Sequence, residues 1–396
     1  MQAFDQRKPL KVLMLSGYGL LGGDIQTNMV ALRSFDPGKF DLYVISKPRG
    51  EVYEQLKQIP GLKVFPMEMG NSELSLPGQS KKIIRAMEFF AAALRITAFV
   101  KQHHIDVIYT IDRSVDPNLG ALVTRLTGCP FVLNAAFPYY PQTGAMARFV
   151  LRQAARVQIH SRFLQERLQP YVKDHSRFKV IQHGLELDHY DLALDGSDIR
   201  KLYDVDATSP LIVMMGRLDP YKGQDDLIQA AAIVIRERPD AQFLIAGRAA
   251  WADGGAVKQS LDDLIVRLAV GKNVRLIGYA PSIPQFLAAA TIVAMPSQEE
   301  PYGIVAMEAM AMARPVVSTR AGGVPEFVVH KQVGMLVPPR NPAELAKAIL
   351  YLINNPEAAQ AMGQEGRRRI EEYHTARGYA RQVAELIEDA ALSKAR

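Results

Sequence analysis

Short apolar runs alternate with longer segments of helical spacing along the first half of the chain. Apolar runs bounded by turn residues are typical of buried strands, and the segments between them are long enough to connect parallel strands. The pattern therefore predicts an α/β fold with a parallel sheet. Its strands are expected at Leu10–Ser16, Asp41–Ser46, Leu62–Met67, Asp106–Asp112, Phe131–Ala135, Val157–His160 and Phe178–Gln182.

The same alternation starts again in the second half, after the polar stretch Glu186–Ser209. This stretch is predicted to be a linker because it is rich in turn residues, including Asp195-Gly196-Ser197-Asp198. Two Rossmann-like domains are therefore expected, over residues 1–185 and 186–375. The strands of the second domain are expected at Leu211–Met215, Ala241–Ala246, Val274–Ile277, Thr291–Met295, Val316–Thr319 and Met335–Val337.

Composition narrows the classes of protein and partner. The chain has 396 residues, 48% apolar and 22% charged, as is typical of a globular protein with two or three domains. Its net charge of +6 is modest and its basic residues are scattered, so nucleic acid is not an expected partner. The single cysteine, Cys129, excludes an internal disulfide and favours a reducing cytoplasm. No segment reaches the roughly 20 apolar residues of a membrane span.

Two glutamates stand out after the strand expected at Thr291–Met295. Glu300 precedes an Ala/Met-rich helical segment, and Glu308 is expected about two turns inside it. Both carboxylates can face the opening above the strand's carboxyl end, where ligands bind in doubly wound sheets. Each ionised carboxylate can accept a pair of O–H bonds, so the two glutamates suit a sugar joined to a nucleotide.

A structural interpretation of the same glutamates stays open. Glu300 can cap the following helix, and Glu308 can lie on a solvated face of it. Apolar residues surround Glu308 in the helical pattern, among them Ile304, Val305 and Met307. A carboxylate with only a structural role would be poorly placed there, so we favour binding.

Glycines and cations follow other strands in the pattern of a phosphate site. The loop Gly17-Tyr18-Gly19-Leu20-Leu21-Gly22-Gly23 leads into a helix expected over Asp24–Ser34, where backbone N–H groups can approach an anion. In the second domain, Gly216-Arg217 and Lys222-Gly223 place two cations five residues apart in one turn. Together they can hold a pyrophosphate, although both can also be surface cations.

Two further strands of the second domain end in glycine. The pairs Gly247-Arg248 and Gly278-Tyr279 follow the strands at Ala241–Ala246 and Val274–Ile277. They can line a slot for a nucleobase, but glycine after a buried strand is also common where no ligand binds.

The longest predicted helix, Ser80–Gln102, combines basic and aromatic residues. Such a helix can lie on an anionic membrane. The alternative, which we favour from the sequence, is a crossover helix that packs its apolar stripe on the sheet. The residues in question are Lys81, Lys82, Arg85, Arg95 and Lys101, with Phe89, Phe90, Leu94 and Phe99.

Taken together, five motifs resemble the family 4 retaining glycosyltransferases. They are Gly22-Gly23, the Gly216 to Gly223 turn, Gly278-Tyr279, Glu300-x7-Glu308 and Ala321-Gly322-Gly323-Val324-Pro325-Glu326. The resemblance implies a GT-B fold, with two Rossmann-like domains facing across a cleft. It places the nucleotide-sugar donor in the second domain and the acceptor in the first. A final helix, Ala376–Leu392, would cross back, so that residues 376–396 complete the first domain.

The resemblance also assigns roles to residues. Arg217 and Lys222 would contact the donor diphosphate, Glu308 the ribose and Glu300 the transferred sugar, with Arg217, Lys222 and Glu300 as the catalytic set. Members generally use no metal or other cofactor, and the sequence has no Asp-x-Asp motif. The expected donor-binding residues are Gly22, Gly23, Gly216, Arg217, Lys222, Gly247, Gly278, Tyr279, Glu300, Tyr302, Gly303, Ile304 and Glu308.

The acceptor side departs from the family pattern. Where members often carry histidines, this chain has Tyr109-Thr110-Ile111-Asp112 and Asn134-Ala135-Ala136-Phe137. Asp112, Arg113 and Asn134 are the polar residues at the expected strand ends and are named as acceptor candidates. His160 and His183 can equally be structural.

The function implied is transfer of a hexose from a UDP-sugar or GDP-sugar to a hydroxyl of a glycan, lipid or small metabolite, with retention and without metal. A sugar-nucleotide epimerase of the same fold and a non-catalytic nucleotide-sugar-binding protein are the alternatives. The expected location is the cytoplasm, with contact to the inner face of the membrane through residues 80–102 as an open possibility.

Overall fold

The computed structural model describes residues 8–17, 23–69, 78–111, 115–136, 144–248, 254–280 and 282–393. The chain folds into two compact units. Unit 1 comprises Met1–Gly184 and Ala376–Arg396, and unit 2 comprises Leu185–Thr375.

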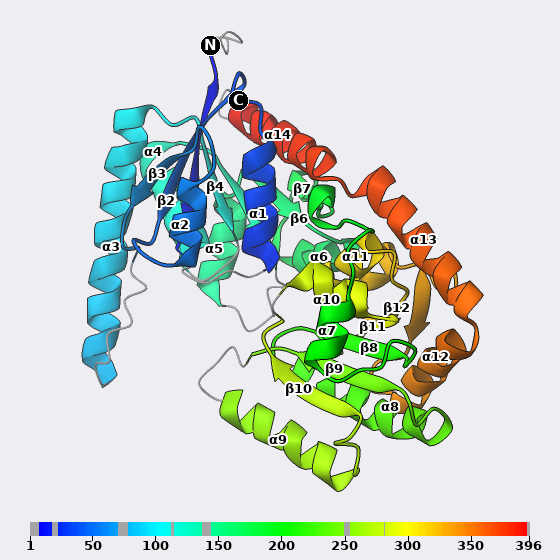
Figure 1. Ribbon diagram of the computed structural model, residues 1–396. Coiled ribbons are helices and arrows are strands. Elements are labelled where there is room, and N and C mark those ends of the chain that lie inside the picture. The colour runs from blue at the N-terminus through cyan, green and yellow to red at the C-terminus, as the bar shows by residue number, and fades with distance from the viewer. Residues whose placement is uncertain are drawn as a thin grey trace. The chain divides into compact units, whose positions relative to one another are not determined.

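Unit 1 contains a sheet of seven parallel strands in the order β3-β2-β1-β4-β5-β6-β7 (Figure 1). The order reverses between β1 and β4, as in other doubly wound sheets. The predicted α/β class with a parallel sheet is thus confirmed for this unit. The strands are β1 (Leu10–Ser16), β2 (Phe40–Ser46), β3 (Lys63–Pro66), β4 (Val107–Ile111), β5 (Phe131–Ala135), β6 (Arg156–Ile159) and β7 (Phe178–Val180).

Helices cover both faces of the unit 1 sheet. Met29, Val52 and Tyr379 belong to the core on one face, and Ala92, Leu119 and Val150 to the core on the other. The first face carries α1 (Gly23–Ser34), α2 (Glu51–Lys57) and the C-terminal α14 (Ala376–Ser393). The second carries α3 (Gly78–His103), α4 (Asp116–Thr127), α5 (Ala145–Gln153) and α6 (Arg162–Leu168), with η1 (Gln169–Tyr171) and η2 (His175–Arg177) following. Of the helices in the described ranges, none has the length and apolar content to cross a bilayer.

Unit 2 contains a second parallel sheet, of six strands in the order β10-β9-β8-β11-β12-β13. Its strands are nearly continuous apolar runs, as expected where both faces are covered. They are β8 (Leu211–Met215), β9 (Gln242–Ala246), β10 (Val274–Gly278), β11 (Ile292–Met295), β12 (Val316–Thr319) and β13 (Gly334–Val337).

Two cores enclose the unit 2 sheet. One face packs against α8 (Gln224–Glu237), α9 (Gly254–Arg267) and α12 (Pro342–Asn354). The other packs against α7 (Ser197–Leu202), α10 (Ile283–Ala289) and α11 (Ile304–Ala311). The long α13 (Pro356–Tyr373) contributes residues to both cores, and the short helices are η3 (Leu187–His189), η4 (Pro220–Lys222) and η5 (Val324–Glu326).

The stretch predicted to be a linker, Glu186–Ser209, is instead a folded part of unit 2. Tyr190, Ile199 and Val205 are buried in its core. The polar turn reflects close packing, because a Cβ at Gly196 would lie 2.2 Å from the backbone nitrogen of Ala289. The linker prediction is therefore wrong, and the boundary between the units falls at Gly184 and Leu185.

Candidate active site

The turn after β8 is built by its own side chains and by the loop after β11. Asp219 accepts a hydrogen bond from the Tyr221 N–H at 3.0 Å and so caps η4. Gly223 has a φ of 76°, and a Cβ there would lie 2.2 Å from the Pro296 carbonyl oxygen. The Gln298 N–H donates to the Tyr221 carbonyl at 2.8 Å. These contacts hold the two loops together at the carboxyl ends of β8 and β11.

The structure brings Lys222 and Glu300 into direct contact. Lys222 Nζ lies 2.6 Å from Glu300 Oε2, and the Ser297 hydroxyl donates to the same oxygen at 3.2 Å. Both charged side chains are largely buried, which strengthens a charge-assisted hydrogen bond. Arg217 lies in the same turn but is more exposed, with Nη2 3.6 Å from Asp219 Oδ2. The predicted cations are thus both held by carboxylates at the strand ends.

The Gly322-Gly323 pair positions the backbone of Glu300. The Gly323 N–H donates to the Glu300 carbonyl oxygen at 3.0 Å. Gly322 has a φ of 59°, and a Cβ there would lie 1.8 Å from that same oxygen. Only glycine allows this approach, so the role of the Ala321 to Glu326 run at this site is to fix Glu300.

Glu308 is deeper than the sequence suggests. Because α11 begins at Ile304, after Gly303 with a φ of 104°, Glu308 lies just over one turn inside the helix and not two. Its side chain is buried and accepts a hydrogen bond from the Tyr190 hydroxyl, with 3.0 Å between the two oxygens. Burial raises the pKa of the Glu308 carboxyl to about 7, against the opposing effect of the Tyr190 hydrogen bond.

Tyr190 is a site residue that the sequence analysis missed. Arg367 of α13 donates from Nη1 to the carbonyl oxygens of Tyr190, at 2.7 Å, and Ala311, at 2.6 Å. These bonds fix the Tyr190 segment against the end of α11. Because Tyr190 was assigned to a linker and lies 118 residues from Glu308, no local pattern pairs them.

The residues predicted to line a nucleobase slot differ in their surroundings: one is packed against backbone, and the others face open space. A Cβ at Gly247 would lie 2.0 Å from the Gly216 carbonyl oxygen, so close backbone packing accounts for this glycine. Gly278 has a φ of 71° with open space around it. Tyr279 is exposed, and the Arg248 guanidinium lies 5.2 Å from its ring centroid.

The other residues predicted to bind the donor lie in several different surroundings. Tyr302 is buried, with its ring 5.0 Å from that of Phe327, and Ile304 is half-buried against the core. Gly23 begins α1 in unit 1. Gly22 and the acceptor candidates Asp112 and Arg113 lie outside the described residues.

The third acceptor candidate, Asn134, lies in a buried hydrogen-bond network of unit 1. Its Nδ2 donates to Asn28 Oδ1 at 3.0 Å and to the Tyr109 hydroxyl at 2.9 Å, and its Oδ1 lies 2.7 Å from His160 Nε2. Gln158 extends the network by donating from Nε2 to the Tyr379 hydroxyl of α14 at 3.0 Å. The amide of Asn134 is thus bonded to protein groups at both ends.

Two histidines of unit 1 that were named from the sequence are also internal. His160 and His183 are buried and stack with their ring centroids 3.8 Å apart. Burial lowers the pKa of His160 to about 4, so the ring is neutral near pH 7. Asp116, which sequence analysis did not single out, accepts from the Gly17 N–H at 2.8 Å at the start of the glycine loop, and burial raises its pKa to about 7.

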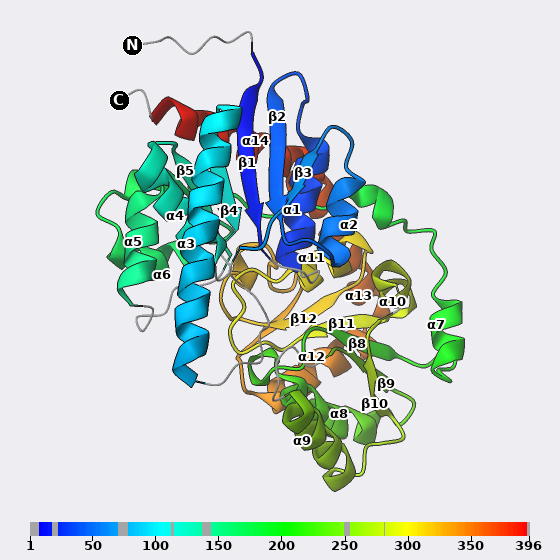
Figure 2. The ribbon, with the colours of Figure 1, turned by 90° about the vertical axis from the view of Figure 1, so that its left-hand side faces the viewer.

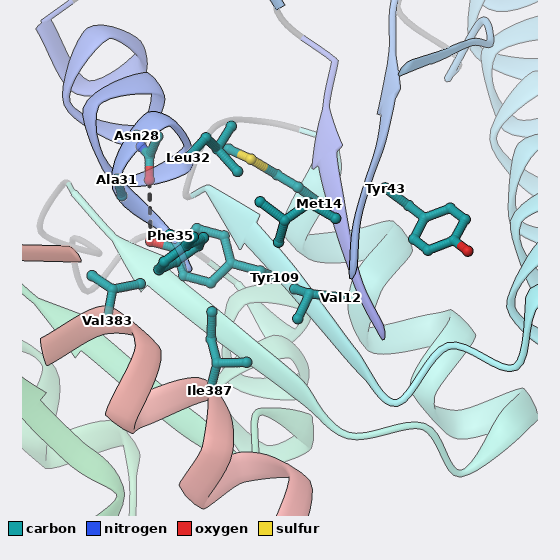
Figure 3. Close-up of a pocket in the computed structure, with 11 residues that line it drawn as sticks. Val12, Met14, Asn28, Ala31, Leu32, Phe35, Tyr43, Tyr109, Val383 and Ile387 are labelled. Carbon is teal, nitrogen blue, oxygen red and sulfur yellow. Dashed lines mark hydrogen bonds between the residues drawn. The ribbon is translucent and has the colours of Figure 1, made fainter. Parts of the chain in front are cut away.

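A small cavity in unit 1 lies beside this network (Figure 3). Val12 and Met14 of β1, Phe35 after α1, and Val383 and Ile387 of α14 line it, and Tyr109 and Asn28 lie at its wall. The volume open to the centre of a water molecule is about 10 Å³, which is about the minimum for one water. The cavity is therefore a packing gap and is too small for a sugar nucleotide.

Relatives of known class identify the chain. The family described as glycosyl transferases group 1 matches residues 196–369. Alpha-maltose-1-phosphate synthase of Mycolicibacterium smegmatis is 31% identical over 282 residues, covering 64% of this chain and 72% of the relative. The chain belongs to the group 1 glycosyltransferases. D-inositol 3-phosphate glycosyltransferase of Segniliparus rotundus is 31% identical over 217 residues, covering 54% of this glycosyltransferase and 47% of the relative. The chain thus spans about half the length of that relative.

Solved structures extend the likeness to the whole glycosyltransferase at the level of fold. Anabaena Alr3699/HepE, in complex with UDP and glucose, superposes with a TM-score of 0.81 at 23% identity, covering 96% of this chain and 99% of that one. Sucrose-phosphate synthase from Thermosynechococcus elongatus superposes with a TM-score of 0.77 at 20% identity, covering 96% and 98%. The predicted GT-B fold is confirmed. The family match of this glycosyltransferase falls within unit 2, which also holds Lys222, Glu300 and Glu308.

Proposed function

We propose that unit 2 binds a nucleoside diphosphate sugar and that the protein transfers the hexose to an acceptor hydroxyl with retention at the anomeric carbon. The observation that carries the proposal is the 2.6 Å pair of Lys222 and Glu300, with Arg217 in the same turn as Lys222, at the carboxyl ends of parallel strands. Ligands of doubly wound sheets bind at such ends. The family match supports the same class of reaction.

Each charged group suits one part of the donor. Lys222 and Arg217 offer a point charge and a planar fork to the diphosphate. Glu300 has a second oxygen, Oε1, for hydroxyls of the sugar, while its Oε2 contacts Lys222 and Ser297. A carboxylate has about four acceptor positions, so Glu308 can bond ribose hydroxyls in addition to Tyr190.

The proposed reaction is balanced by the donor and acceptor themselves. The bond between C1 and the phosphate oxygen breaks, and its electron pair goes to that oxygen. The acceptor oxygen bonds to C1 from the same face, and its proton passes to the departing phosphate. Lys222 and Arg217 stabilise the charge that grows on the leaving diphosphate, by electrostatics already in place before the reaction.

Titration calorimetry with UDP-sugars and GDP-sugars tests the donor class. A matching donor at about 100 times its dissociation constant should also raise the free energy of unfolding by roughly 2.7 kcal/mol. NMR of the product formed with a hydroxyl acceptor then reports the anomeric configuration. If the folded protein bound none of these donors, or if the product had inverted configuration, the proposal would be wrong in that part.

Glu308→Gln tests the ribose contact separately. The substitution keeps the size of the side chain but replaces a charge-assisted acceptor with a neutral amide, so affinity for the donor should fall while the protein stays folded. Glu344→Gln, at a partly exposed position at the start of α12 where the carboxylate pairs with Lys347, is the matched control and should bind as the parent does. Unchanged affinity in folded Glu308→Gln would remove Glu308 from the donor site.

A further inference from the structure

The helix α3 has two halves with different surroundings. Ala92, Ala93, Ile96 and Val100 are buried against the unit 1 sheet, whereas residues 83–91 include no buried side chain. Figures 1 and 2 both show the N-terminal half running on past α4 and α5, the other long helices of that face. The second half is therefore the crossover helix that the sequence favours, and the first half needs a different explanation.

Four large apolar side chains lie exposed in one line along α3. The exposed fractions are 62% for Ile83, 67% for Met87, 58% for Phe90 and 66% for Leu94. Their spacing of four, three and four residues places them on a single face of the helix. Leu94 is two positions from both Ala92 and Ile96, about 200° around the helix, so the line faces away from the sheet. Exposed apolar patches of this kind mark contact surfaces.

Phe89 and Phe99, which the sequence suggested as membrane contacts, are half-buried and pack against the unit 1 core. Phe90 and Leu94 remain exposed, and Ile83 and Met87 join them. The structure thus selects a different and continuous set of residues as the apolar line.

The charges on α3 are mostly of one sign. Over Gly78–His103 the helix carries five lysines and arginines against one acid, Glu88. Lys101 is exposed and lies seven residues after Leu94, on the same face, and the exposed Arg95 lies about 100° around the helix from Leu94, at the edge of the line. Arg85 is also exposed, but it lies about 200° from Ile83 and from Met87, on the opposite side of the helix. Apolar side chains flanked by cations are complementary to the acyl and headgroup layers of an anionic bilayer.

We propose that the N-terminal half of α3 binds the surface of an anionic membrane through Ile83, Met87, Phe90 and Leu94. A second copy of the chain fits this face less well, because pairing two such helices would bring their cations together with few acids to neutralise them. The proposal concerns unit 1 alone and does not rest on the donor site of unit 2.

Flotation with lipid vesicles tests this surface without any substrate. The parent should float with vesicles of phosphatidylcholine and phosphatidylglycerol, less so at high salt, and should not float with phosphatidylcholine alone. Met87→Gln with Phe90→Gln should abolish flotation and leave the melting temperature unchanged, since both side chains are exposed. Val266→Gln, at an equally exposed apolar residue of unit 2, is the matched control and should float as the parent does.

Charge substitutions separate the two contributions to binding. Replacing Arg95 or Lys101 with Gln should in each case lower the partition coefficient about fivefold, whereas Arg85→Gln, on the opposite side of the helix, should lower it less. Equal flotation of the parent and the Met87→Gln, Phe90→Gln variant, or no flotation of the parent, would overturn the proposal. So would a dimer by light scattering that the same variant dissociates while vesicles have no effect, since the face would then bind a second copy.

Discussion

Both units carry polar side chains near the carboxyl ends of their strands, but the chemical groups differ between the two units. In unit 1, Asn134, Tyr109 and Gln158 form a buried network of neutral groups that reaches α14. In unit 2, Lys222 and Glu300 form a charged pair, and Arg217 is partly exposed beside them. The unit 1 residues lie on β4, β5 and β6, whereas the unit 2 residues lie in the loops that follow β8 and β11.

We interpret the difference as one between groups that complete a fold and groups that we propose bind a ligand. Neutral amides and hydroxyls that bond one another when buried cost little and rigidify the sheet. Charged groups at a partly buried site lose hydration, and their pairing often gives little net stability in return. A charged cluster at a sheet edge is therefore better explained by binding of a charged ligand than by stability, and the following experiments test that division.

The largest effect is expected at the cations of unit 2. Lys222→Ala or Arg217→Ala should each lower turnover by roughly 10² to 10³, by analogy with the loss of one donor from a preorganised oxyanion site. The double variant should lose less than the product of the two effects, because both cations act on one diphosphate. Steady-state kinetics with the donor identified by calorimetry measures these losses.

The control for this prediction is Arg238→Ala, which removes a cation paired with Asp240 in another loop of unit 2 and should leave turnover unchanged. EDTA should also leave the parental rate unchanged, since the cations are assigned the charge of the diphosphate. If chelation stopped the reaction while Lys222→Ala kept near-parental turnover, a metal ion would hold the diphosphate instead.

The next effect concerns the backbone of Glu300. Gly322→Ala places a Cβ against the Glu300 carbonyl oxygen and should lower turnover by up to about 100-fold, as misplacement of a catalytic site by about 1 Å can do. Gly128→Ala is the matched control, because Gly128 has a similar positive φ of 71° but open space around it. It should cost only about 1 to 2 kcal/mol of stability, from backbone strain, and leave turnover unchanged.

A smaller effect, on stability, is expected in unit 1. Asn134→Ala leaves the buried partners His160, Tyr109 and Asn28 short of a hydrogen bond and should lower the free energy of unfolding by about 1 to 3 kcal/mol. Donor affinity should stay parental, since unit 2 is untouched. Urea unfolding and calorimetry check the two halves of this statement. Lost turnover at unchanged stability and donor affinity would instead support Asn134 as an acceptor residue.

The smallest effect is a pH dependence of donor binding. With the pKa of Glu308 at about 7, the fraction ionised rises about tenfold from pH 6 to pH 8, and affinity for an intact nucleotide sugar should rise with it. Glu308→Gln should flatten this profile. Tyr190→Phe removes a hydrogen bond that lowers the pKa of Glu308, so it should move the midpoint to higher pH. An unshifted midpoint in folded Tyr190→Phe would leave Tyr190 with a packing role only.

The raised pKa of Glu308 also predicts how the stability of the ligand-free protein changes with pH. The folded pKa of Glu308 lies above the ordinary value of 4.5, so the folded protein binds more protons than the unfolded chain between these values. The contribution of Glu308 to stability is therefore full below about pH 4.5 and is lost as pH rises through about 7. Urea unfolding of the parent and of Glu308→Gln at about pH 5 and pH 8 should show this difference.

Strands were predictable from the sequence where burial on both faces leaves little room for polar residues. Leu211–Met215 is such a run, and β8 has the same bounds. The prediction that Glu186–Ser209 is a linker was wrong because turn residues indicate where the chain bends, and a chain that bends can still be packed into a core. Gly196 is there because Ala289 packs against it, and only the folded structure shows this contact.

Within the site, the sequence predicted which types of side chain lie at the strand ends, but it did not predict which of these side chains contact one another. Lys222 and Glu300 were placed at strand ends, but their ion pair joins residues 78 positions apart. Asn134 was named because it is polar at a strand end, which does not distinguish a ligand contact from a buried network. The sequence indicated part of the exposed apolar line on α3, because Phe90 and Leu94 were among the residues named. It did not indicate which side of the helix faces solvent, because that depends on how far the helix extends beyond the sheet.

The position of α14 has a consequence for the order in which the chain can fold during synthesis. Tyr379, Val383 and Ile387 complete the core on one face of the unit 1 sheet, yet they follow the whole of unit 2 in the sequence and are synthesised after it. Unit 2, which is continuous over Leu185–Thr375, can close its core before the first-made unit does. On that face the N-terminal sheet then has only α1 and α2 to cover it during the synthesis of nearly two hundred residues, and apolar surface exposed in this way is prone to aggregation.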